Sequence, residues 1–171
     1  MGGKYLVTSR PVPELSALNN EEVELENIDA TDVDVTAKVG KFNGLARLQL
    51  SSDKLKDFTH TLLNDAGEKV IVGYDKAGNN YYLDRTTSGK INFEKGFAAK
   101  HTAPRFLSKS NMDMTLIIDQ SSIELFADNG LTVMTQIFFP NTPYNRITLQ
   151  SPDQFLIKSL QYNLVKSIWT M

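Results

Sequence analysis

Two acidic residues, Asp119 and Glu124, are the first candidates for chemistry, because paired carboxylates can act as general acid and base. On a regular strand a separation of five residues points the two side chains to opposite faces of a sheet. They become neighbours only if residues 120–122 bend the chain. We therefore do not expect an acid–base pair here, and no catalytic residue is predicted from it.

Aromatic and charged residues also gather near the ends of a predicted hairpin. Tyr74 and Asp75 end its first strand, and Tyr82, Asp84 and Arg85 lie along its second. A carboxylate and a guanidinium can each hold vicinal hydroxyls, and an aromatic ring offers a flat apolar surface, so these residues could bind a polyol. Alternation places Tyr82 and Asp84 on one strand face and Arg85 on the other. The alternative, more common for such residues, is that they tie a loop to the sheet through buried hydrogen bonds.

Several kinds of site are excluded or disfavoured by what the chain lacks. It has no cysteine, and therefore no thiol nucleophile, thiolate zinc site or disulfide. Its two histidines, His60 and His101, have no metal-binding spacing, and we expect both to be polar surface or loop residues. No cofactor or metal site is predicted. The chain has no EF-hand spacing that would support a calcium site. We expect its run of four acidic residues to form the solvated face of a strand: Glu21, Glu22, Glu24 and Glu26.

Charge and hydropathy narrow the choice of partners. Eighteen basic and twenty acidic residues give a net charge of −2, and the basic residues are scattered, so nucleic acid is not an expected partner. No apolar run approaches the roughly 20 residues that span a bilayer, so no membrane partner is expected either. With 41% apolar and 22% charged residues, the chain should fold around its own core.

Strict alternation of apolar and polar residues predicts most of the secondary structure. Residues 32–39, D-V-D-V-T-A-K-V, place Val33, Val35, Ala37 and Val39 on one face, as in a half-buried strand. The same pattern predicts strands over residues 44–50, 69–74, 80–84, 112–119, 122–127, 131–139, 146–150 and 155–166. The only fair helix candidate is a short connector over residues 13–18, which begins with a proline.

Turn residues predict how these strands connect. Gly78 lies in a D-K-A-G-N turn between two of them, and Asn129-Gly130 is the strongest hairpin signal because both residues tolerate the left-handed conformation. Many short strands with almost no helix favour a β-sandwich or a barrel. Alternation predicts that six apolar side chains face the core: Ile118, Ile123, Leu125, Val133, Ile137 and Phe139.

Two neighbouring segments then resemble a known family. D-Q-S-S-I-E-L-F-A-D-N-G (residues 119–130) and V-M-T-Q-I-F-F-P (residues 133–140) are similar to the signature of the C-terminal β-sandwich of glycoside hydrolase family 32, which includes levanases, inulinases and invertases. Residues 5–15 resemble the end of the family's catalytic domain and its linker. The module's other recurring segments are resembled, in the right order, by residues 71–75, 82–89 and 164–169. The resemblance covers nearly the whole chain. It implies an all-β fold of two packed antiparallel sheets, jelly-roll or concanavalin-like, with minimal helix.

The resemblance also implies that this chain is not an enzyme by itself. In the family a five-bladed propeller supplies the catalytic carboxylates from W-x-N-D-P, R-D-P and E-C segments. This chain has no Asp-Pro dipeptide and no cysteine, and its Asn64-Asp65 is followed by Ala66. No residue here inherits a catalytic role, and the parent protein is expected to be a glycosidase of the β-fructofuranosidase or levanase type.

Two functions follow from the resemblance. The first is structural: the sandwich stabilises the propeller of the same parent chain and mediates subunit contacts, including those of a homodimer. The second is binding, since the module is also similar to carbohydrate-binding module family 66, which recognises terminal fructosyl units of levan or inulin. Seven residues are the candidates for holding such a chain end: Tyr74, Asp75, Tyr82, Asp84, Arg85, Asp119 and Glu124.

We expect residues 1–20 to be a linker with a short helix, preceded by a cloning scar at residues 1–3, and residues 21–171 to be the sandwich domain. The sequence leaves the compartment open, with a secreted or periplasmic bacterial parent as the expectation. It also leaves open the linkage that the parent cleaves and which sheet faces the propeller.

Overall fold

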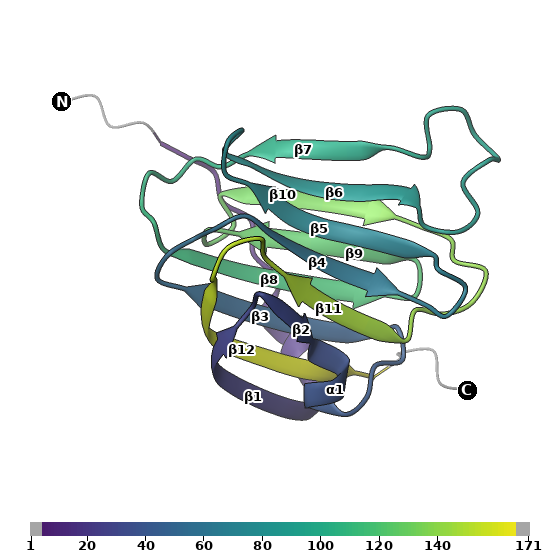
Figure 1. Cartoon of the computed structure of the whole chain (residues 1–171), viewed down its shortest axis with the longest axis horizontal. Coiled ribbons are helices and arrows are strands. Elements are labelled where there is room, and N and C mark those ends of the chain that lie inside the picture. Colours follow the sequence, from purple (N-terminus) through teal and green to yellow (C-terminus); the bar gives the residue numbers. More distant parts are fainter. Residues whose placement is uncertain (1–4, 167–171) are drawn as a thin grey trace.

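The computed structural model describes residues 5–166 of the 171-residue chain, and these form a sandwich of two six-stranded sheets (Figure 1). Sheet A contains, in order across the sheet, β1 (Asn19–Asp29), β12 (Leu156–Val165), β3 (Ala46–Ser52), β8 (Met112–Asp119), β9 (Ser122–Ala127) and β10 (Thr132–Ile137). Sheet B contains β2 (Asp32–Asp34), β11 (Arg146–Gln150), β4 (Phe58–Leu63), β5 (Lys69–Asp75), β6 (Asn80–Thr87) and β7 (Lys100–Pro104). All neighbouring strands run antiparallel, so the all-β two-sheet fold expected from the sequence is confirmed.

The core lies between the sheets and is built by the alternation seen in the sequence. On β3 the buried apolar residues are Ala46, Leu48 and Leu50, and each lies directly opposite a buried residue of β8. Side chains between these positions point to the outer face of sheet A. The outer faces of the two sheets are therefore the surfaces on which polar strand residues can form a site.

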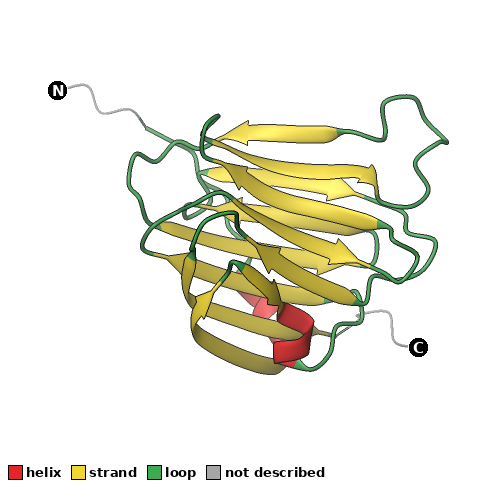
Figure 2. Ribbon diagram, viewed as in Figure 1, coloured by secondary structure: helices red, strands yellow, loops and turns green. Residues whose placement is uncertain are grey.

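Within residues 5–166, helix is confined to two short segments (Figure 2). The 3-10 helix η1 (Pro13–Leu18) confirms the predicted connector, but α1 (Val35–Val39) replaces most of the strand predicted over residues 32–39. The Asp34 carboxylate accepts a hydrogen bond from the Ala37 amide at 3.0 Å and so caps this helix. Val35 and Val39 are four residues apart, which puts both on one helix face as well as on one strand face, so alternation could not separate the two structures.

The register of β10 corrects half of the predicted core. Ile118, Ile123 and Leu125 are buried as expected, whereas Val133, Ile137 and Phe139 are 38%, 48% and 37% exposed. The core positions of β10 carry Thr132, Met134 and Gln136 instead, because these residues lie opposite the inward residues Ala127, Leu125 and Ile123 of β9. The turn over residues 128–131, with positive φ at Asp128, Asn129 and Gly130, sets this register.

The sequence did not predict β4 or β7, and His60 lies on the former. His60 faces the core and is 1% exposed, so its prediction as a surface or loop residue is wrong. Its inward position interrupts the apolar face of β4 formed by Phe58 and Leu62, which hid the strand. Burial lowers the pKa of His60 to about 4. His101, on the edge strand β7, is exposed as expected.

Candidate functional site

The structure distributes the seven candidate residues over the core and both outer faces. Tyr74 points inward: its ring packs 5.2 Å from that of Tyr81, and its hydroxyl donates to Asn79 Oδ1 at 2.8 Å. It is 5% exposed. Its ring is therefore a core element that leaves little surface for a sugar.

Tyr82 lies on the outer face of sheet B, where its ring covers the neighbouring strand at Gly73. A Cβ at position 73 would overlap the ring, so the absence of a side chain there creates the resting place of Tyr82. The Lys100 ammonium stands 3.7 Å from the ring centroid. Burial, together with the negative charges of Asp84 and Asp75, raises the pKa of the Tyr82 hydroxyl. With the strand beneath the ring and Lys100 over it, a sugar could stack here only by displacing Lys100.

Asp84 and Arg85 are both occupied by contacts within the chain. Asp84 Oδ1 accepts hydrogen bonds from the amide and hydroxyl of Thr86 at 2.9 and 2.7 Å. Arg85 donates to the carbonyls of Phe97 and Ile137 at 2.6 and 3.0 Å, and its guanidinium lies 3.9 Å from the centre of the Phe97 ring. Burial lowers the pKa of this guanidinium. Arg85 thus ties the β6–β7 loop to the end of β10.

A shallow depression on sheet B brings three of the seven candidates together. It has a volume of about 480 Å³, and its lining includes Tyr74, Asp75 and Tyr82 as well as Asp57 and Lys100. Asp75 Oδ1 accepts the Ala77 amide at 3.0 Å, which leaves its second carboxylate oxygen without a hydrogen bond among the described residues. Of the seven residues expected to hold a polyol, three therefore line one depression.

Asp119 and Glu124 lie on the other sheet. Residues 120–121 form a tight hairpin turn, so Asp119 pairs with Ser122 and Glu124 with Ile117. The bend that the sequence left as the exception therefore occurs, and both carboxylates lie on the outer face of sheet A instead of on opposite faces. Asp119 Oδ1 accepts the Gln120 amide at 2.7 Å. Because sheet A and sheet B present separate outer faces, the seven residues cannot form one site.

The sequence did not reveal a cleft on the outer face of sheet A. The N-terminal arm (residues 5–12) meets the β9–β10 turn, where the Ser9 amide donates to the Gly130 carbonyl at 3.1 Å and Arg10 bonds Asn129 Oδ1 at 3.2 Å. Arg10 and Pro11 form one wall of a cleft of about 430 Å³, whose floor is provided by β3, β8, β9 and β12. Alternation over residues 44–50 puts Arg47 and Gln49 on one strand face, but only the fold puts the arm beside them.

Gly130 should be required for the position of the arm. It has a φ of 79°, and an added Cβ would collide with the Ser9 carbonyl. Gly130→Ala should therefore cost about 1–2 kcal/mol of backbone strain and also release the arm. Hydrogen exchange of the Ser9 amide, measured by mass spectrometry or NMR, should become much faster.

Gly67→Ala is the matched control, because Gly67 has a φ of 80° but no atom near its missing Cβ. It should be strained to a similar degree while exchange at Ser9 stays slow. Equal exchange rates in the two variants would show that the arm is not held at Gly130.

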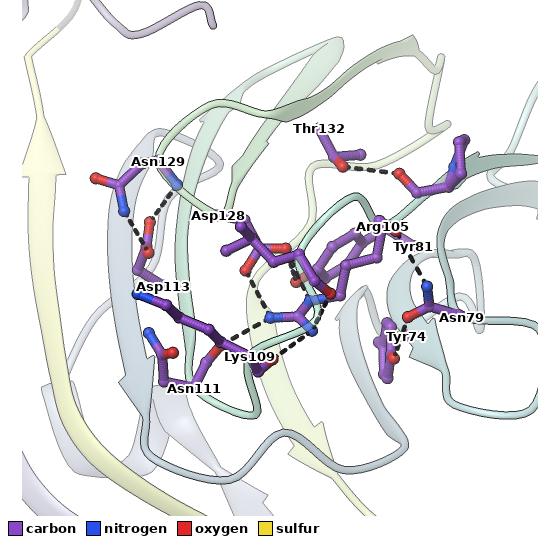
Figure 3. A network of polar contacts seen from close by, with 12 residues as sticks. Tyr74, Asn79, Tyr81, Arg105, Lys109, Asn111, Asp113, Asp128, Asn129 and Thr132 are labelled. Atoms are coloured by element: carbon purple, nitrogen blue, oxygen red, sulfur yellow. Dashed lines mark hydrogen bonds and ion pairs between the residues drawn. The ribbon is translucent and has the colours of Figure 1, made fainter. Parts of the chain in front are cut away.

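A buried polar network lies close to the same turn (Figure 3). The Arg105 guanidinium donates to both carboxylate oxygens of Asp128, at 2.8 and 3.1 Å, and the Tyr81 hydroxyl donates to Asp128 at 3.1 Å. The remaining guanidinium hydrogens go to the carbonyls of Leu107, Lys109 and Asn111. All five N–H donors of the Arg105 guanidinium are thus used within the chain. The network fixes the loop that follows β7 to the β9–β10 turn.

Neither a metal centre nor a membrane-spanning helix is found in the described part of the chain. Within residues 5–166 no three His, Asp or Glu side chains are grouped so that they could hold a metal ion. No helix in this range has the length and apolar character needed to cross a bilayer.

Comparison with known proteins identifies the family of this domain. The model of the glycosyl hydrolases family 32 C-terminal domain matches residues 8–163. The chain belongs to this family. The resemblance recognised in the sequence is thereby confirmed, including its two-sheet sandwich; residues 167–169 of its last motif and the supposed scar at residues 1–3 lie outside the described residues.

Relatives of this family 32 domain are hydrolases of fructans and sucrose derivatives. The levanase of Bacillus subtilis (strain 168) is 24% identical over 169 residues, which cover 95% of this chain and 25% of the levanase. The exo-inulinase of Aspergillus awamori superposes with a TM-score of 0.79 and 22% identity, over 99% of this chain and 34% of that one. The sucrose-6-phosphate hydrolase of Lactobacillus gasseri gives a TM-score of 0.75 and 20% identity, over 94% and 31%. The chain thus spans about a quarter to a third of these proteins.

Proposed function

We propose that this chain is the non-catalytic C-terminal sandwich of a larger fructan- or sucrose-hydrolysing glycosidase, and that it stabilises the catalytic propeller of the same parent chain. The observation that carries the proposal is that the family match spans residues 8–163 while the relatives are about three to four times longer. The carboxylate motifs that the family uses for hydrolysis are absent from the sequence. Subunit contacts remain a prediction from the resemblance.

Exposed apolar residues support a docking surface on the arm side of sheet A. Tyr5, Val7 and Val12 on the arm are 101%, 92% and 58% exposed. Val133 and Ile137 project from the outer face of β10, which begins just after the turn that holds the arm. Large apolar side chains gathered on one side of a domain indicate a surface covered by another protein part. We therefore propose that this surface, rather than sheet B, contacts the propeller.

Replacing Val133 and Ile137 by aspartate tests this docking surface in the full-length parent. Buried charges at the interface should separate the unfolding of the two domains and lower the melting temperature of the catalytic domain, as measured by differential scanning calorimetry. The isolated chain should be almost unaffected, because both residues are exposed in it.

Ile71→Asp is the matched control, since Ile71 lies on the outer face of sheet B, between inward-facing Val70 and Val72. It should leave the coupling of the domains unchanged. A parent protein that responds only to Ile71→Asp would instead place the propeller against sheet B.

The second expected result is that the isolated chain has no hydrolytic activity. The isolated chain, incubated with sucrose, inulin or levan, should release no fructose above background, because it lacks the two propeller carboxylates. Fructose is measured by anion-exchange chromatography. Release at an enzyme-like rate that survives replacement of both Asp119 and Glu124 would refute the non-catalytic assignment.

Binding of fructan ends is the second candidate function, favoured by the depression that gathers Tyr74, Asp75 and Tyr82 on sheet B. The free carboxylate oxygen of Asp75 and the ammonium of Lys100 can hold vicinal hydroxyls. On this hypothesis levan should retard the chain in a native gel and Asp75→Asn should abolish the shift. Arg85→Ala should lower thermal stability, because Arg85 is tied to two backbone carbonyls.

A further inference from the structure

The cleft beside the N-terminal arm has the chemistry of a ligand site that differs from the depression on sheet B. We propose that it binds a polyhydroxylated ligand bearing one oxyanion, such as a sugar phosphate or a sugar acid, with Arg47 as its anchor. This inference goes beyond the proposed scaffold role. It rests on an unpaired guanidinium, on unused hydroxyl and amide groups, and on the position of the cleft.

Arg47 is the unusual residue of the cleft. It lies on the outer face of β3, paired with Asn163 of β12 and Ile117 of β8. Its Nε is buried without a hydrogen-bond partner, and its guanidinium forms no ion pair with a carboxylate among residues 5–166. Arg47 as a whole is only half-buried, and the terminal nitrogens of its guanidinium are accessible and unpaired among the described residues, so an oxyanion in the cleft can reach them.

Asp113, the acid in the lining of the cleft, is already used. Asp113 accepts the Asn129 amide at 2.7 Å and the Asn129 side chain at 2.9 Å (Figure 3). Arg10 is likewise bound to Asn129 through its side chain. Two guanidinium groups and one carboxylate therefore line the cleft, so its lining carries a net charge of +1, while Glu22, Glu24 and Glu124 lie further out on the same face of sheet A. This charge balance favours an anionic ligand over a neutral one.

The floor around Arg47 can hold hydroxyl groups. It carries four polar side chains that make no hydrogen bond within the described residues: Gln49, Ser51, Thr115 and Ser159. The side chain of Phe126 adds one aromatic surface at the β9 side. Directed amide and hydroxyl groups around an apolar ring are what recognition of a polyol requires. A cleft of about 430 Å³ is large enough for a monosaccharide and its anionic group.

The position of the cleft also suits a ligand. One wall is the arm that leads away from the sandwich, so in a longer parent the cleft opens at the junction between two domains. Ligand sites are frequent at such junctions. A ligand held there would touch both the arm and the sheet.

Isothermal titration of the isolated chain with fructose 6-phosphate, glucuronate, fructose and inorganic phosphate tests the proposal. The two anionic sugars should bind, fructose should bind at least about tenfold more weakly, and inorganic phosphate should also be weak because it cannot use the floor. The difference in affinity between fructose 6-phosphate and glucuronate identifies the preferred oxyanion. Amide chemical shifts should change at residues 47, 49 and 115.

Arg47→Met keeps most of the aliphatic stem, removes the charge, and should reduce the affinity at least about tenfold while the melting temperature is maintained. Lys69→Met removes the same charge from the exposed start of β5 on sheet B and should have no effect. Equal binding of fructose and its phosphate, equal losses in the two variants, or no binding of any probe would overturn the proposal. Binding by the isolated chain but not by the full-length parent would overturn it too, because the neighbouring domain would then fill the cleft.

Discussion

Asp128→Asn should destabilise the sandwich by about 3–5 kcal/mol, because it leaves the Arg105 guanidinium buried without its counter-charge. Arg105 and Asp128 are 7% and 0% exposed. Asparagine tolerates the positive φ of 53° at this position, so the loss reports on charge rather than on backbone strain. The asparagine amide would also direct a donor at the donors of Arg105. Burial and the neighbouring Asp128 already raise the pKa of the Tyr81 hydroxyl, which remains a donor in this network.

Urea denaturation, monitored by far-UV circular dichroism, measures this loss. The control is Asp53→Asn, which breaks the ion pair between Lys158 and Asp53, two side chains that are 61% and 79% exposed. Surface pairs contribute little, so the midpoint of this control should not move measurably. Equal effects of the two substitutions would mean that the Arg105 network is not a main determinant of stability.

Acidification should weaken the fold through His60. Its pKa is about 4 in the folded chain, against 6.5 when unfolded, so the unfolded chain takes up a proton first as the pH falls. The stability linked to neutral His60 is therefore fully present above pH 6.5, and it is lost as the pH falls from 6.5 to 4. A shift of this size corresponds to about 3 kcal/mol. His60 lies between Val72 and Leu149 on the neighbouring strands, which offer no acceptor for the imidazolium.

His60→Leu should remove this pH dependence. Both ring nitrogens are buried without partners, so the substitution should also raise the free energy of unfolding at pH 7.5 by about 1–3 kcal/mol. The measurement is urea unfolding at several pH values between 4 and 7.5. His101→Gln, at an exposed histidine, should leave the pH profile unchanged. A wild-type profile that is flat between pH 6.5 and 4 would contradict the role of His60.

The sequence predicted strands best where a clean apolar face pairs with a clean polar face. On β8, alternation placed Met114, Leu116 and Ile118 inward, and all three are buried. It failed where large apolar residues lie on the outer face of a strand and polar residues on its inner face. Val133 and Ile137 are as apolar as core residues, but β10 is an edge strand whose inward positions are filled by Thr132 and Gln136. The pairing with β9, which one strand cannot reveal, decides between the two faces.

Prediction of the candidate site from the sequence was limited in the same way. Residue types alone identified seven side chains with suitable chemistry, but groups bind a ligand together only if the fold brings them to one surface. Tyr74 and Tyr82 are on opposite faces of sheet B, and Asp119 and Glu124 are on sheet A. The cleft at Arg47 was not predictable, because its wall is residues 10–11 and its floor comes from strands far along the chain.

Sequence patterns were enough to predict the all-β class, the main hairpins, the family and the lack of its catalytic motifs. These depend on local alternation, on turn residues and on short segments of consecutive residues. The three-dimensional structure was needed for four other features: the register of β10, the burial of His60, the helix at Val35–Val39 and the cleft at Arg47. Each of these depends on contacts between segments far apart in the chain, whose free energy outweighs the local preference of any one segment.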